Sequence, residues 1–73
     1  SNSVERTERA VKQAMSHPEE FAVEHAFNSL ERTENALANA ENKQEHLDIV
    51  EQNKAKLDEL KQNILEIDEN LNS

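Results

Sequence analysis

The chain has 73 residues and a formal net charge of −8 at pH 7, with no cysteine, no glycine and one proline. This length allows one small domain, no apolar run approaches the ~18 residues of a membrane span, and the negative charge disfavours direct binding to nucleic-acid phosphates. Helix-forming residues dominate and strand formers are sparse, so an all-α fold is predicted. The lack of cysteine favours a cytoplasmic location.

The first helix is predicted over residues 4–15. Ser3 is a candidate N-cap, and Val4, Val11 and Met15 share one face of the helix. Residues 1–3 resemble the remnant of a cleaved expression tag, so we expect them to be disordered and place the single domain at residues 4–73.

Pro18 predicts a break and the start of a second helix over about residues 18–41. Proline fits the first turn of a helix, and it disfavours helical geometry at the residue before it. Ser16 and Glu19 also have the spacing of a capping box. The alternative is a proline kink within one continuous helix.

A second turn is predicted near Asn42, which separates a third helix at about residues 43–71. Asparagine tolerates the left-handed conformation that ends helices, and Asn42 with Glu45 has capping-box spacing. The heptad frame also slips by one residue here, which a turn absorbs. The alternative is a single helix over residues 18–72 with a stutter-like defect.

The third helix carries a heptad pattern of apolar residues, which predicts one apolar seam. The candidate interface residues along this seam are Val50, Leu57, Leu60, Ile64, Ile67 and Leu71. Together with the helix lengths, the seam predicts an antiparallel hairpin with a short N-terminal helix, assembling into a dimeric bundle.

Folding the hairpin at Asn42 predicts which residues face each other. Counting from the turn places Leu37 opposite Leu47, Leu30 opposite Leu57, and Phe21 near Ile64. Ile67 and Leu71 would then extend past Pro18. Either the first helix, through Val11 and Met15, or another chain must cover them.

No residue pattern indicates a catalytic, cofactor or metal site. The histidines are His17, His25 and His46, and none has a glutamate three residues before it, as a di-iron bundle motif requires. We therefore interpret them as surface residues. His25 could make an interface sensitive to pH near 6.5.

These patterns favour a non-enzymatic protein-interaction module, a small regulator or adaptor acting as a helical homo-oligomer. A negative stripe would suit a protein partner with a basic surface; its members are Glu19, Glu20, Glu24, Glu31, Glu34 and Glu41. Two alternatives are an acidic nucleic-acid mimic that inhibits a DNA- or RNA-binding protein, and a structural coiled-coil fragment of a longer chain. We expect no cofactor, no direct nucleic-acid binding and no membrane association.

Overall fold

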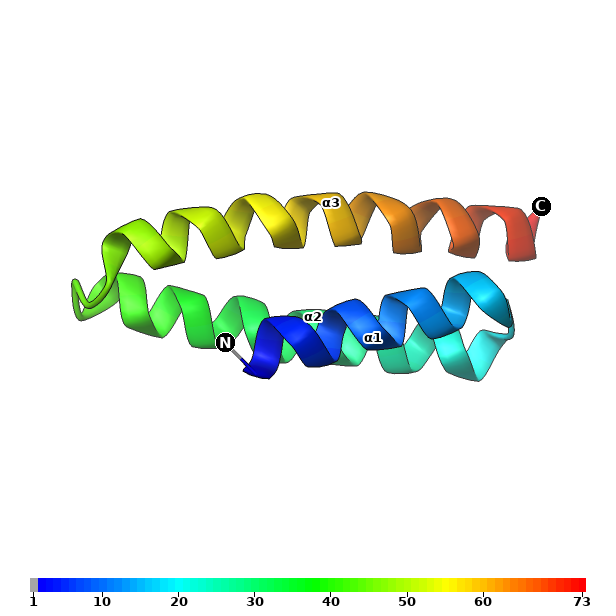
Figure 1. The fold of residues 1–73 in the computed structure, drawn as a ribbon. Coiled ribbons are helices and arrows are strands. Elements are labelled where there is room, and N and C mark those ends of the chain that lie inside the picture. Colours follow the sequence, from blue (N-terminus) through cyan, green and yellow to red (C-terminus); the bar gives the residue numbers. More distant parts are fainter. Residues whose placement is uncertain (1) are drawn as a thin grey trace.

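A computed structural model describes residues 2–73, and Figure 1 shows their arrangement in three helices. These are α1 (Asn2–Ser16), α2 (Glu20–Asn42) and α3 (Leu47–Asn72). The predicted all-α fold is confirmed, because residues 2–73 contain no strand. α2 and α3 form a long hairpin, and α1 lies beside the half of the hairpin away from the α2–α3 loop (Figure 1). The molecule measures 40 × 18 × 15 Å.

α1 begins earlier than the sequence predicts. It includes Asn2 and Ser3, so Ser3 is a helical residue and the prediction of an N-cap there is wrong. The Ser3 carbonyl oxygen lies within hydrogen-bond distance of the hydroxyls of Thr7, at 3.0 Å, and Thr33, at 3.1 Å. Thr33 belongs to α2, so a tertiary contact holds the first turn of α1. Ser1 lies outside the described residues.

The predicted break at Pro18 is confirmed, since three residues, 17–19, connect two separate helices. α2 begins at Glu20, and its N-cap residue Glu19 is extended, with φ of −121°. No side chain caps this helix, and Ser16 still belongs to α1, so the predicted capping box is wrong. Proline's effect on the residue before it accounts for the end of α1, whereas α2 starts beyond Pro18 because Glu19 is extended.

The predicted second turn is confirmed, but its chemistry differs. α2 ends at Asn42, and the left-handed residues are Gln44, with φ of 57°, and His46, with φ of 51°. The amide of Glu45 donates to the carbonyl of Ala40 at 3.0 Å, which is the long hydrogen bond of a Schellman ending. Gln44 therefore occupies the position that usually holds glycine. The predicted capping box of Asn42 and Glu45 is wrong, because α3 starts at Leu47 without a side-chain cap.

The core lies between all three helices. Its buried members are Ala10, Val11, Ala14, Ala22, Val23, Ala26, Leu30, Leu57, Leu60 and Ile64. α1 and the first turns of α2 contribute mostly small residues, which let these two helices approach closely. The branched side chains of α3 fill the space opposite them. Phe27, Leu37 and Ile67 are half-buried against this core.

The predicted hairpin register is partly wrong. Leu47 is 48% exposed, so it does not pack against Leu37, which instead lines a cleft with Leu57. Phe21 is 68% exposed and does not pack on Ile64, which is fully buried. The physical reason is that α3 begins at Leu47, four residues later than predicted. Residues 43–46 form a loop instead of a first helical turn, which shifts α3 along α2.

The same shift removes the predicted overhang of α3. α2 has 23 residues and α3 has 26, a difference of about 4.5 Å in length. The first turn of α2 reaches Asp68 and Asn72, so α3 does not run far past Pro18. The first helix covers this end in part, and Leu71 stays 36% exposed. Val11 is fully buried, and Met15 lines a hollow with Ile67.

Candidate functional site

α1 is held on one side of the hairpin by two buried threonines. The Oγ1 atoms of Thr7 and Thr33 are 2.9 Å apart, and Thr7 also lies 3.1 Å from the carbonyl oxygen of Ser29. Both side chains are almost completely buried. Among the described residues, no buried side-chain polar atom lacks a partner. The α1–α2 contact is therefore a satisfied polar contact within an interface of small residues.

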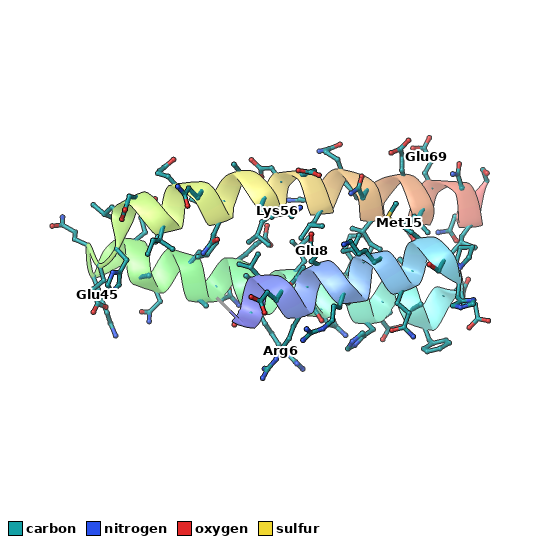
Figure 2. The ribbon with its side chains drawn as sticks, viewed as in Figure 1. Arg6, Glu8, Met15, Glu45, Lys56 and Glu69 are labelled. Atoms are coloured by element: carbon teal, nitrogen blue, oxygen red, sulfur yellow. The ribbon has the colours of Figure 1, made fainter. Side chains whose placement is uncertain are left out.

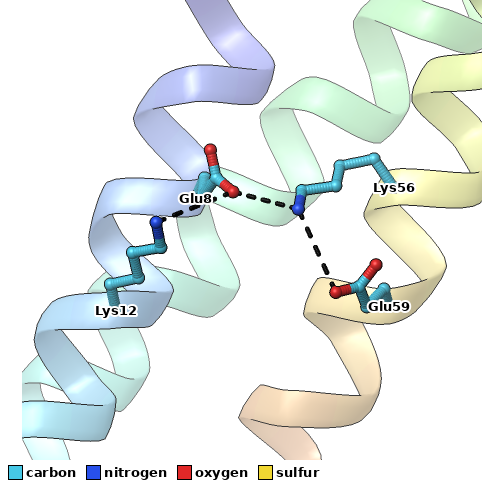
Figure 3. Close-up of polar contacts among 4 residues, drawn as sticks. All are labelled: Glu8, Lys12, Lys56 and Glu59. Carbon is cyan, nitrogen blue, oxygen red and sulfur yellow. Dashed lines mark ion pairs between the residues drawn. The ribbon is translucent and has the colours of Figure 1, made fainter.

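An ion pair joins α1 to α3 on the same side. Lys56 Nζ lies 3.0 Å from the Glu8 carboxylate, with Lys12 at 3.9 Å from the same oxygen (Figure 3). The hydrogen bond from Lys56 lowers the pKa of Glu8, and the bond to Glu8 raises the pKa of Lys56. Figure 2 places Glu8 and Lys56 facing each other between the two helices. α1 thus contacts both arms of the hairpin.

Within residues 2–73, no helix lies over the opposite side of the hairpin. On α2, Ser29 and Thr33 face α1, whereas Glu34 and Ala38 line a cleft with α3. At 100° per residue, the two sets are separated by about 140° around the helix. We call this uncovered side, between α2 and α3, the open groove.

Two hollows lie along the open groove. The first, near the loop, has a volume of about 190 Å³ and is lined by Glu34, Leu37, Ala38, Glu41, Lys54, Leu57 and Asp58. The second, near the α1–α2 turn, has a volume of about 300 Å³ and is lined by Glu20, Val23, Glu24, Phe27, Asn28, Asp68 and Asn72. Neither hollow is lined by a residue of α1. In both, apolar side chains lie among carboxylates.

Two ion pairs cross the groove and fix its register. Lys54 Nζ lies 3.0 Å from the carboxylate of Glu41, and Lys61 Nζ lies 3.9 Å from that of Glu34. The pairs are two helical turns apart on both helices, as antiparallel packing requires. The hydrogen bond to Glu41 raises the pKa of Lys54. Both pairs are solvent-exposed, so they orient the helices more than they stabilise them.

The rims of the groove follow the 3–4 spacing of one helix face. The α2 rim is Glu20, Glu24, Phe27, Glu31, Glu34, Ala38 and Glu41. The α3 rim is Lys54, Asp58, Lys61, Leu65, Asp68 and Asn72. Seven carboxylates and two ammonium groups give a formal charge of −5. Leu65, between the two hollows by this spacing, is 41% exposed.

The predicted interface residues lie on a different face of α3. Val50, Leu57, Leu60 and Ile64 are buried within the chain itself. Ile67 is half-buried beside Met15, and Leu71 is 36% exposed. The seam is therefore mainly the chain's own core, and Leu57 alone also reaches the open groove.

Part of the open groove was visible in the sequence. Five of the six residues in the predicted negative stripe lie on its α2 rim, and the sixth, Glu19, is the N-cap of α2. The α3 rim was missed, although Asp58, Leu65 and Asp68 have helical spacing. The sequence pattern of this rim is a weak predictor of a binding surface, because it mixes charges of both signs with one leucine.

The histidines and acids do not converge. His17, His25 and His46 are exposed, and in residues 2–73 no three histidine, aspartate or glutamate side chains are grouped as metal ligands would be. Within the same residues, no helix is long and apolar enough to cross a membrane. Comparisons of the chain with protein-family models, curated proteins and solved structures find no match.

Proposed function

We propose that this protein is a non-enzymatic protein-interaction module, a small regulator or adaptor that binds its partner through the open groove. The supporting observation is the asymmetry of the hairpin. α1 closes one side through Thr7 and Glu8, while the other side keeps an apolar-floored cleft at Leu37 and Leu57. Helical bundles bury such a side against a further helix.

A second part of this proposal is that two copies of the chain associate. Their interface would be smaller than the predicted seam, because most seam residues are buried within one chain. Met15 is 55% exposed, and it lies beside Ile67 near the end of α3, one turn before Leu71. These three residues form an apolar end that two copies could share. Two open grooves would instead repel each other, because each carries a charge of −5.

The dimer is tested by light scattering over about a hundredfold range of concentration, because dimer formation follows mass action. An unchanged monomer mass throughout would contradict it.

The rims of the open groove give less support to the alternative function, an acidic nucleic-acid mimic. Lys54 and Lys61 interrupt its carboxylates, and each pairs with a glutamate across the groove. A row of phosphates has no such interruption.

The binding proposal is tested by blocking the groove without disturbing the core. Ala38 is exposed and lines the 190 Å³ cleft, so Ala38→Arg places a long side chain in it. Ala55 is also exposed, lies on α3 and lines neither hollow, so Ala55→Arg is the matched control. A protein captured from the native host by the wild type and Ala55→Arg, but lost with Ala38→Arg, is the expected result. Identical captures by all three chains would contradict the proposal.

A further inference from the structure

The geometry points to the chemistry of the partner: an amphipathic α-helix with lysine or arginine flanking an apolar stripe, lying along the open groove. This inference rests on the proposed function and deepens it by naming the class of ligand. Its apolar stripe would contact Leu37, Leu57 and Leu65. Its cationic side chains would meet the carboxylates on the two rims.

The apolar part follows from the two hollows. The first is lined by Leu37, Ala38 and Leu57 and has a volume of about 190 Å³. That is room for a large aliphatic side chain. The second hollow has Val23 and Phe27 at its base. Exposed Leu65 lies between them, so apolar surface continues along the groove.

The spacing of the hollows and the length of the groove both fit a docked helix. Their α2 linings are centred about 13 residues apart, which corresponds to about 20 Å along the groove. In a docked helix, two apolar anchors four turns apart, at positions i and i+14, would reach both hollows from one face. The whole α2 rim, from Glu20 to Glu41, is about 31 Å long, the length of a helix of about 20 residues.

The charge selects a basic partner over a second copy of this chain. The rims carry −5, and Lys54 and Lys61 are already paired with Glu41 and Glu34. Only a helix of opposite sign gains from this field. The chain's own basic helix is unsuitable, because Val4, Val11 and the alanines of α1 are buried in its own core.

The test uses two synthetic helical peptides of 21 residues that share one leucine stripe. One has lysine at its remaining positions, and the other has glutamate at those positions. Fluorescence anisotropy measures their binding to the full chain at physiological salt. We expect the lysine peptide to bind at least about tenfold more tightly than the glutamate peptide. Equal binding, or no binding of the lysine peptide, would overturn the inference.

Matched variants distinguish docking from general attraction between opposite charges. Glu34→Gln/Asp58→Asn removes two carboxylates from the groove, and Glu45→Gln/Glu69→Gln removes two from outside it (Figure 2). The groove variant should weaken binding several-fold and the control should change it less than twofold. Equal weakening by both would overturn the inference, because it would show attraction without a site.

The steric variants complete the design. Ala38→Arg should abolish binding of the lysine peptide, whereas Ala55→Arg should preserve it, with circular dichroism showing that both chains stay helical. If Ala38→Arg loses a cellular partner while the lysine peptide fails to bind the wild type, the proposed function holds and the inferred chemistry is wrong. If Ala38→Arg changes neither the captured proteins nor peptide binding, both fail.

Discussion

Thr7 and Thr33 face each other across the α1–α2 interface, with their Oγ1 atoms 2.9 Å apart and both side chains buried. Backbone carbonyl oxygens of Ser3 and Ser29 lie within 3.1 Å of these hydroxyls. The pair joins residues 26 positions apart in the chain. Because both hydroxyls are satisfied, the two threonines can hold α1 on the hairpin where its alanines bury little apolar area.

A double-mutant cycle tests this contact. Thr7→Val and Thr33→Val each keep the shape of the side chain and remove the shared hydrogen bond, so each should cost about 1 kcal/mol of unfolding free energy. The double variant should cost less than the sum of the two single variants, since the contact between the two hydroxyls is lost in each of the three chains. Urea denaturation measures the three values. Strictly additive losses would show that the two hydroxyls act independently.

The α2–α3 loop holds a strained residue that glycine should relieve. Gln44 has φ of 57° at the Schellman position, where a side chain carries a steric cost. Gln44→Gly should therefore raise the unfolding free energy by about 0.5–1 kcal/mol. Lys43, with φ of −83°, is the matched control, and Lys43→Gly should not stabilise the chain. Equal effects at both positions, measured by thermal unfolding, would show that the left-handed geometry is not maintained in solution.

The ion pair of Glu8 and Lys56 should give a signature in acid. Lys56 lowers the pKa of Glu8 in the folded chain, so the stabilisation is fully present above the pKa of the unfolded glutamate, about 4.3. It is lost as the pH falls through the lower, folded pKa. The melting temperatures of wild type and Glu8→Gln should therefore differ at pH 7 and converge in acid. For Glu69→Gln, an exposed control, the difference should stay small at every pH. A Glu8→Gln difference that persists at pH 2 would contradict this electrostatic origin.

Ile64 is the centre of the core, being fully buried on α3. Ile64→Asp places a carboxylate in an apolar site, which costs on the order of 4–5 kcal/mol, close to the whole stability of a small domain. Circular dichroism should show loss of the helical signal. Glu31→Lys, on the exposed groove rim, should keep it. A helical Ile64→Asp chain with wild-type melting would show that α3 packs through another face.

The sequence predicted the helices well because their signals are local. Pro18 and the heptad spacing from Val50 to Ile64 each depend on a short stretch of sequence. The two breaks between helices fall near Pro18 and Asn42, as predicted. The ends of the helices were harder to place. The local capping patterns at Ser16 and Asn42 did not mark where α2 and α3 begin, at Glu20 and Leu47.

The role of the seam could not be read from one chain's pattern. A heptad run is the same whether its partner is a second molecule or another helix of the same chain. In the folded chain, Val11 and the alanines of α1 pack in the same core as Ile64, although α1 has few large apolar residues. This contact is between helices of one chain, and the heptad pattern of α3 alone does not predict it. The α3 rim of the open groove was missed for a related reason, since the two rims meet only after the register of α2 and α3 is known.

Photo-crosslinking in the native host tests the central claim most directly. A benzophenone amino acid is placed at position 38, within the open groove, or at position 55, outside it, in otherwise unchanged chains. If the groove is the binding surface, irradiation should join position 38 to another protein and leave position 55 without that adduct. An adduct formed equally from position 55, or no adduct from position 38, would contradict the assignment of the open groove as the site of interaction.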